Sequence, residues 1–236
     1  MQITPLGDSA LLLELGDSIN ESTCRQVQAA WRALAAEPLP GVSEVTPAYT
    51  TVTLFYDAPR VVEAGAPEDE IVEWLSARLR ERLKSPPKSA RTAKPRVVEI
   101  PVCYGGEHGP DLDRVAAQAK LPPGEVIKRH SAAKYLVHLI GFAPGFPYLG
   151  GLPPELATPR HARPRMAVPA GSVAIGGEQT GIYPQVTPGG WNLIGRTPLR
   201  LFRPDEYPPA LLRPGDEVRF KPINADEFAR LQEVAP

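Results

Sequence analysis

Twenty-nine prolines in a chain of 236 residues restrict the possible folds more than any other feature of this sequence. Proline has no backbone N–H to donate, and it does not fit the interior of a helix or of a central strand. The chain must therefore contain many loops, turns and sheet edges between short elements. Because 42% of the residues are hydrophobic, we still expect an ordinary core, in one large domain or two small ones.

Charge and cysteine content exclude several classes of protein. A formal net charge of −1 argues against a nucleic-acid-binding protein. Cys24 and Cys103 are too few for a disulfide framework, and their positions match no metal-binding spacing. Residues 1–18 lack the pattern of a secretory signal, and no later stretch is apolar enough to span a membrane. We therefore predict a soluble cytoplasmic protein that binds neither nucleic acid nor membrane.

Residues 1–90 alternate between patterns typical of strands and of helices. From Val52, every second residue to Tyr56 is apolar or aromatic, as expected for a strand with one buried face. Ser18 and Glu21 have the spacing of a capping box before a helix. Two helices on one face of a small, mostly antiparallel sheet would bury their apolar sides. Strands are predicted at 10–15 and 46–57, and helices at 22–37 and 68–84.

A basic, proline-rich segment at residues 84–96 separates two halves of different composition. It has the character of a solvated linker, so we predict an N-terminal domain of residues 1–90 and a C-terminal domain of residues 97–236. In the second half, two helical patterns are followed from Tyr135 onward by short β-rich runs between Gly and Pro. This pattern is typical of a closed or nearly closed β-barrel.

The stretch 171–198 combines seven glycines with several polar side chains. Glycine is kept where the chain takes positive φ or where another group comes very close, so the stretch is either an array of tight turns or a binding surface. We favour a barrel mouth, where the glycines let loops turn sharply and expose backbone N–H groups. Side-chain donors would reach the same mouth from Gln179, Thr180, Tyr183 and Arg196.

A second unusual segment, residues 141–153, places three aromatic residues among glycines and prolines. Phe142, Phe146 and Tyr148 either pack beneath a barrel mouth or form the apolar wall of a site for a ligand or partner. The nearby arginines are either scattered surface residues or ligands of a carboxylate or phosphate. They are Arg160, Arg163 and Arg165.

Familiar catalytic motifs are missing from the sequence. It has no phosphate-binding G-x-x-x-x-G-K-[ST] loop, no G-x-S-x-G elbow and no H-E-x-x-H pair. Ser172 has no lysine or histidine close by in sequence that would activate it as a nucleophile. His130 lies at the C-terminal end of a predicted helix, where it either caps the helix or carries protons at a site. His108 and His138 are interpreted as structural or surface residues.

Three segments, 130–153, 164–198 and 211–220, closely resemble the signatures of the KipI family. This family includes the B subunit of 5-oxoprolinase and proteins labelled allophanate hydrolase subunit 1. The resemblance implies an α+β protein with a small N-terminal α/β domain, a ferredoxin-like sheet with two helices, and a C-terminal cyclophilin-like β-barrel. Thr187 stands where family members commonly have serine, a change that keeps the hydroxyl.

The resemblance also implies a function. We expect a subunit of an ATP-dependent 5-oxoprolinase, which cleaves 5-oxo-L-proline to L-glutamate and uses ATP with the Mg²⁺ that the nucleotide carries, without an intrinsic metal. The chain is expected to be active only with its KipA-like partner, the C subunit of 5-oxoprolinase, and a separate lactam-hydrolysing A subunit is the other expected partner. His130 and Arg196 are the predicted catalytic residues. The predicted substrate- or nucleotide-binding residues are Phe146, Arg165, Ser172, Gln179, Thr180, Tyr183, Gly190 and Trp191.

Two other functions remain open within the same family. One is a KipI-type inhibitor of a sensor histidine kinase, in which the aromatic loop at 142–148 would be a protein-binding face. The other is a carboxyltransferase-like subunit related to urea carboxylase and allophanate hydrolase. The sequence has no biotin-attachment signature.

Overall fold

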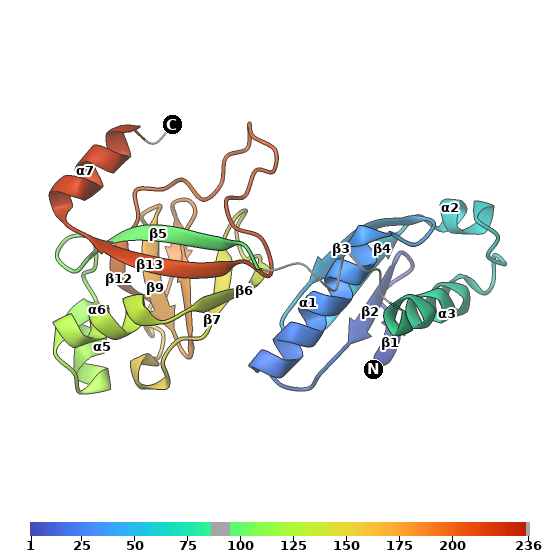
Figure 1. Ribbon diagram of the computed structural model, residues 1–236, viewed down its shortest axis with the longest axis horizontal. Helices are drawn as coiled ribbons and strands as arrows, with labels where there is room; N and C mark the ends of the chain where they lie inside the picture. The colour runs from blue at the N-terminus through green and yellow to red at the C-terminus, as the bar shows by residue number, and fades with distance from the viewer. Residues whose placement is uncertain (86–94, 235–236) are drawn as a thin grey trace. The chain divides into compact units, whose positions relative to one another are not determined.

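The computed structural model describes residues 1–85 and 95–234. The chain forms two compact units, Met1–Lys94 and Pro95–Pro236, each with its own hydrophobic core (Figure 1). Most of the predicted linker, residues 86–94, lies outside the described residues. Every helix within the described ranges is too short or too polar to cross a lipid bilayer.

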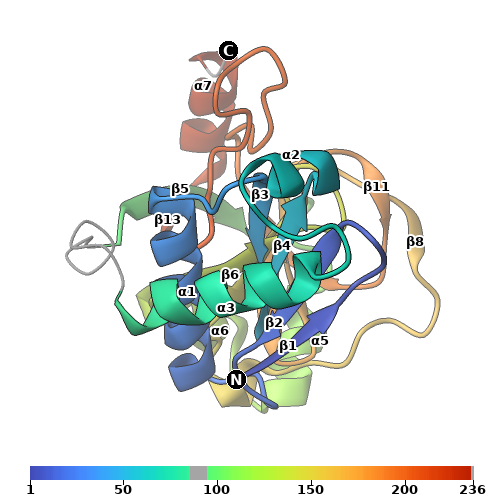
Figure 2. The ribbon, with the colours of Figure 1, turned by 90° about the vertical axis from the view of Figure 1, so that its right-hand side faces the viewer.

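The N-terminal unit is an antiparallel sheet in the order β1-β2-β4-β3, with α1 and α3 packed on one face (Figure 2). Alternation along β4 buries Val52, Leu54 and Tyr56 and leaves Phe55 on the other face. The predicted small sheet with packed helices is confirmed, and β1 and β3 are additional strands. The elements are β1 (Gln2–Pro5), β2 (Ala10–Glu14), α1 (Glu21–Ala36), β3 (Val42–Pro47), β4 (Thr51–Tyr56), α2 (Ala58–Glu63) and α3 (Ile71–Lys84).

The first helix is capped by Asn20. Its side-chain oxygen accepts the backbone N–H of Thr23 at 2.9 Å, which satisfies one of the free donors of the first turn. The predicted capping box of Ser18 and Glu21 is therefore wrong, because the helix begins only at Glu21.

The C-terminal unit is a closed barrel in the order β10-β7-β6-β13-β5-β12-β9. Strand β13 runs parallel to β5, and the other barrel pairs are antiparallel. The predicted barrel, and with it the α+β class, is confirmed. The barrel strands are β5 (Val97–Tyr104), β6 (Tyr135–Ile140), β7 (Pro147–Gly150), β9 (Ser172–Gly176), β10 (Gln179–Ile182), β12 (Asn192–Arg196) and β13 (Glu217–Ile223).

Four further helical segments and a two-stranded ribbon complete this unit. Helices α5 and α6 pack against the barrel through Val115 and Val126, and α7 lies beside β5 (Figure 1). The ribbon pairs β8 with β11, next to the loops that carry the candidate site. These elements are α5 (Leu112–Ala119), α6 (Pro123–Ala132), η1 (Pro154–Leu156), β8 (Arg165–Val168), β11 (Thr187–Gly189) and α7 (Ala225–Val234).

Candidate functional site

A hollow of about 310 Å³ opens in the C-terminal unit where the loop after β6, the loop before β8 and the turn before β12 meet. We call it the aromatic hollow. It has the usual form of a small-molecule site, a concave and mostly apolar surface with a few polar groups. It is lined by Phe142, Phe146, Tyr148, Arg160, His161, Pro164, Tyr183, Pro188, Gly189, Gly190 and Trp191.

Four interlocked aromatic side chains form a rigid wall of this hollow. Phe146 is 2% exposed. Its ring centre lies 4.9 Å from that of Tyr148, 5.2 Å from Tyr183 and 5.6 Å from Trp191, each edge to face. Such pairs are favourable beyond the area they bury. The aromatic loop therefore combines both alternatives left open by the sequence, since it packs inward and also lines a hollow.

Phe142 stands at the open rim. Its side chain is 64% exposed, and its φ of 68° is unusual for a bulky residue. Its ring meets those of Phe146 and Tyr183 edge to face, at 5.4 and 6.4 Å between centres. Backbone strain of this kind concentrates at binding and catalytic sites. Phe142 thus presents an apolar surface beside the hollow.

The glycines of the 171–198 stretch make room for these rings. A Cβ at Gly176 would lie 2.5 Å from the ring of Trp191, and one at Gly189 would lie 2.4 Å from the hydroxyl of Tyr183. Both glycines lie in strands, so the prediction that they let loops turn sharply is wrong for them. Their role is close approach, which a side chain of any size would prevent.

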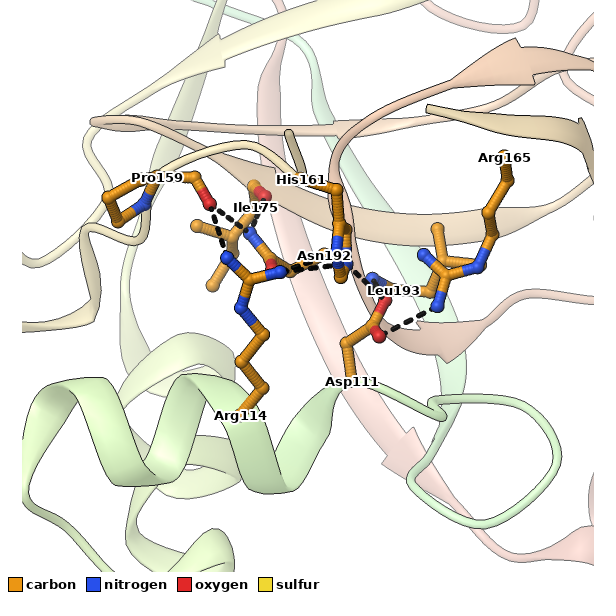
Figure 3. A network of polar contacts seen from close by, with 8 residues as sticks. All are labelled: Asp111, Arg114, Pro159, His161, Arg165, Ile175, Asn192 and Leu193. Carbon is orange, nitrogen blue, oxygen red and sulfur yellow. Dashed lines mark hydrogen bonds and ion pairs between the residues drawn. The ribbon is translucent and has the colours of Figure 1, made fainter. Parts of the chain in front are cut away.

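A buried carboxylate holds the floor of this region together. Asp111, at the start of α5, is 6% exposed and accepts the backbone N–H of Leu193 at 2.7 Å and a guanidinium N–H of Arg165 at 2.7 Å (Figure 3). Burial by itself would raise the pKa of Asp111. The hydrogen bonds from Arg165 and Leu193, with the charge of Arg165, outweigh burial and hold that pKa below its usual value.

His161 connects this carboxylate to the hollow. Its Nε2 lies 3.4 Å from Oδ2 of Asp111, and its Nδ1 accepts from Arg114 (Figure 3). Its backbone N–H donates to the carbonyl of Gly190 at 2.7 Å. Asn192 completes the network by donating to the carbonyls of Pro159 and Ile175. The network fixes the loop before β8, which carries Arg160 at 5.5 Å from the ring centre of Trp191.

Sequence reasoning missed Asp111, Arg114, His161 and Asn192. They are far apart along the chain, and no spacing rule joins them. Asp111 and Arg114 are brought together by one turn of helix, and Asn192 meets Ile175 through the register of β12 with β9. Only the closed barrel brings these groups side by side.

The structure divides the predicted site residues among several places. Four of them line the aromatic hollow, namely Phe146, Tyr183, Gly190 and Trp191. Arg165 lies beside it, paired with Asp111. This grouping shows that the sequence located one wall of the hollow.

The prediction that Gln179, Thr180, Tyr183 and Arg196 face one mouth is wrong. Thr180 is fully buried and points toward His130 inside the barrel, while Gln179 begins the same strand without lining the hollow. Ser172, 2% exposed in β9, is likewise buried. These side chains are separated because successive residues of a strand point to opposite faces and because a strand carries its residues away from the mouth. The glycine pattern showed neither effect.

His130 belongs to the barrel core. It is fully buried, stacks on Phe220 with ring centres 4.6 Å apart, and contacts Tyr104 and Thr180 at 2.8 and 3.1 Å. The hydroxyl of Thr180 donates to the carbonyl of Ala174, so it accepts from His130 Nε2–H. Burial lowers the pKa of His130 to about 3. The predicted role of proton carrier is therefore wrong, because the imidazole stays neutral and out of reach.

Arg196 ends β12 and lines a second, larger hollow of about 560 Å³, which we call the Arg196 hollow. Trp191 of the aromatic hollow precedes the same strand. Five residues of extended chain span roughly 16 Å, so the two hollows lie near opposite ends of β12. Arg196 is therefore not part of the aromatic hollow. Among the described residues, no group of three or more His, Cys, Asp or Glu side chains is arranged to hold a metal ion.

The fold of this chain recurs within larger proteins of known structure. The Kluyveromyces lactis urea amidolyase shares the fold at a TM-score of 0.71 and 19% identity, over 98% of this chain and 15% of that one. TTHA0988 is closer in sequence, at 38% identity and a TM-score of 0.76. The match covers 92% of this chain, which spans only 40% of TTHA0988.

Residues 1–212 match the family model "Carboxyltransferase domain, subdomain C and D", and the chain belongs to this family. It is 46% identical over 237 residues to the B subunit of the 5-oxoprolinase of Bacillus subtilis (strain 168), a match that covers 98% of this chain and 97% of that relative. The resemblance drawn from the sequence motifs is thereby confirmed.

Proposed function

We propose that this chain is a subunit of an ATP-dependent 5-oxoprolinase, which converts 5-oxo-L-proline to L-glutamate in the cytoplasm. The observation that carries the proposal is the 46% identity with the B subunit of a 5-oxoprolinase along 97% of that relative. Both units of the chain are included in this match. The aromatic hollow adds a site whose size suits a compact ring such as a lactam.

Opening an unstrained five-membered lactam needs an activated amide. In our proposal the γ-phosphoryl group of ATP is transferred to the ring carbonyl oxygen, with Mg²⁺ carried by the nucleotide. Water then attacks the ring carbon, the carbon–nitrogen bond breaks, and phosphate leaves. Such a transfer depends on positioning and on charge stabilisation more than on a covalent nucleophile.

The residues of the aromatic hollow suit positioning and charge stabilisation. Burial raises the pKa of Tyr183, so its hydroxyl stays protonated at neutral pH. Arg160 is exposed over Trp191 and has no acidic partner among the described residues, whereas Arg165 is neutralised by Asp111. We assign Arg160 to the negative charge that develops on the substrate, and the aromatic wall to exclusion of water.

We further propose that the KipA-like C subunit covers the hollow and that a separate A subunit takes part in lactam hydrolysis. Phe142 is 64% exposed and Met166, on the neighbouring ribbon, is 85% exposed. A large apolar side chain exposed at the rim of a mostly apolar hollow, as Phe142 is, favours a protein interface there. The similar chain TTHA0988 is much longer than this one, which supports a larger assembly.

An isotope experiment tests the chemistry. The assembled enzyme is given ATP and 5-oxoproline with ¹⁸O in the ring carbonyl, and the phosphate produced is analysed by mass spectrometry. We expect ¹⁸O in the inorganic phosphate, with omission of ATP as the control. Glutamate formed without ATP, or phosphate free of ¹⁸O, would contradict the proposed transfer. An assembly with no turnover, combined with tight binding of the chain to a sensor histidine kinase, would favour the regulatory alternative.

A further inference from the structure

The Arg196 hollow is separate from the proposed lactam site and has a different character. It lies in the C-terminal unit between the turn after β10, the end of β12 and α7. Its volume of about 560 Å³ is within the range of small-molecule sites. The lining residues are Ala170, Gly171, Pro184, Gln185, Val186, Arg196, Thr197, Pro198, Leu199, Arg200, Phe202, Pro204 and Gln232.

Arg196 is held in place by its surroundings. Its Nε donates to the carbonyl of Ala170 at 2.8 Å, and its guanidinium carbon lies 6.0 Å from the ring centre of Phe228. The residue is half-buried, so the side chain is already partly desolvated and ordered. A guanidinium fixed through Nε presents its two terminal nitrogens side by side, which is the geometry that binds a carboxylate or phosphate in two places.

The charge of Arg196 is not balanced by the described part of the chain. Other arginines of the C-terminal unit have acidic partners, such as Arg203 with Glu206 at 2.8 Å and Arg219 with Glu217 at 2.7 Å. No described acidic residue pairs with Arg196. A partly buried cation without a counter-charge attracts an anion strongly, because water screens it less.

The lining of the hollow agrees with this interpretation. It contains Arg196 and Arg200 and no acidic side chain. Gln185 and Gln232 offer neutral hydrogen-bonding groups, while Leu199 and other apolar residues form much of the surface. A ligand with an anionic head and a compact apolar body would match both parts.

We propose that the Arg196 hollow binds a small organic anion, a molecule with a carboxylate or phosphate group on a compact apolar body. The anionic group binds the two terminal nitrogens of Arg196, and the apolar body packs against Leu199 and Phe202. This site lies outside the aromatic hollow and does not depend on the proposed 5-oxoprolinase activity.

Direct binding to the isolated full-length chain tests the proposal. The ¹⁵N-labelled protein is titrated with benzoate, phenyl phosphate and neutral benzamide, and backbone amide signals are followed by NMR. We expect one or both anions to shift the signals of Gly171, Thr197 and Leu199, and benzamide at the same concentrations to leave them in place. The benzoate and phenyl phosphate arms show which anionic group the hollow prefers.

Two variants and a control distinguish the site from general charge attraction. Arg196→Ala should weaken anion binding roughly tenfold or more, as expected for loss of a two-point charge-assisted contact. Val186→Trp should weaken binding by filling the hollow, and Val186 is 65% exposed, so the fold tolerates this change. Arg80→Ala, an exposed arginine of α3, serves as the matched control and should leave binding unchanged.

The proposal is overturned if none of the anions binds, if Arg196→Ala and Val186→Trp both bind as tightly as the wild-type chain, or if the shifts centre on Gly190 and Trp191. These readouts do not involve turnover. Failure of the anion site would leave the proposed 5-oxoprolinase function standing, and absence of turnover would leave the anion site standing.

Discussion

Replacing Asp111 by alanine should destabilise the C-terminal unit by about 2 to 4 kcal/mol. The buried backbone N–H of Leu193 would lose its acceptor, at a cost of about 1 to 3 kcal/mol. The hydrogen bond from Arg165 would also be lost, but it counts for less than a fully buried one, because that side chain is 32% exposed and regains contact with water. A loss of this total size lowers the melting temperature by roughly 8 to 16 °C.

Asp111→Asn is the finer test, because it keeps the shape and one acceptor and removes the charge. We expect a loss of about 1 to 2 kcal/mol at neutral pH. The pKa of Asp111 is lower in the folded chain than in the unfolded one, so its stabilisation is present above the unfolded value, near pH 4, and is lost as pH falls through the folded value. The difference between wild type and Asp111→Asn should therefore shrink below about pH 4.

Urea unfolding followed by Trp191 fluorescence measures these changes in a background with Trp31 and Trp74 replaced by Phe, so that only the C-terminal unit reports. Asp113→Asn is the matched control, since it removes an exposed acid from the same first turn of α5. The reasoning is refuted if Asp111→Asn is no more destabilising than the control. A difference that persists unchanged at pH 3 would equally refute it.

Three further predictions follow from the site and the core. Phe142→Asp should reduce co-purification with the KipA-like subunit in a pull-down assay without lowering the melting temperature, because the side chain is 64% exposed; unchanged assembly would argue against this rim as the interface. Gly176→Ala should push the ring of Trp191 out of place, which should shift the fluorescence emission of Trp191 and weaken binding in the aromatic hollow. An unchanged emission would contradict the distance of 2.5 Å between a Cβ at position 176 and the Trp191 ring. For His130, whose pKa falls from 6.5 to about 3 on folding, stability should decrease by about 1.4 kcal/mol for each pH unit between 6.5 and about 3, since in that range the unfolded chain takes up the proton and the folded chain does not. His130→Gln should reduce this dependence of stability on pH in acid unfolding experiments. The part due to His138, whose pKa is also lowered by burial, should remain. An unchanged dependence would show that His130 is not buried as a neutral group.

Local patterns predicted much of the architecture. The alternation of Val52, Leu54 and Tyr56 correctly placed one face of β4 in the core, because a strand exposes its two faces in strict turn. Dense Gly and Pro between short apolar runs correctly indicated a barrel. The aromatic loop and the glycine-rich stretch also pointed to one wall of the aromatic hollow, through Phe146, Tyr183 and Trp191.

The features that the sequence did not predict depend on contacts between segments that are far apart along the chain. Phe142 and Phe146 belong to one irregular loop without periodicity, so nothing local shows that the first is exposed and the second buried. His130 looked like a residue of the helix end, but three barrel strands supply Tyr104, Thr180 and Phe220 around it. Arg196 and Trp191 are close in sequence and are nevertheless separated, because the extended strand β12 carries them to opposite ends.

The most direct test of the proposed function is to measure ATP hydrolysis that depends on 5-oxoproline in three samples. The first contains the purified chain alone, the second contains the KipA-like and lactam-hydrolysing subunits without this chain, and the third contains all three proteins. Our account predicts turnover and glutamate formation in the complete mixture, and negligible turnover in the other two. Substrate-dependent turnover by the chain alone would contradict the proposed need for partner subunits. Equal turnover by the partners without this chain would show that it is not a required subunit of the enzyme.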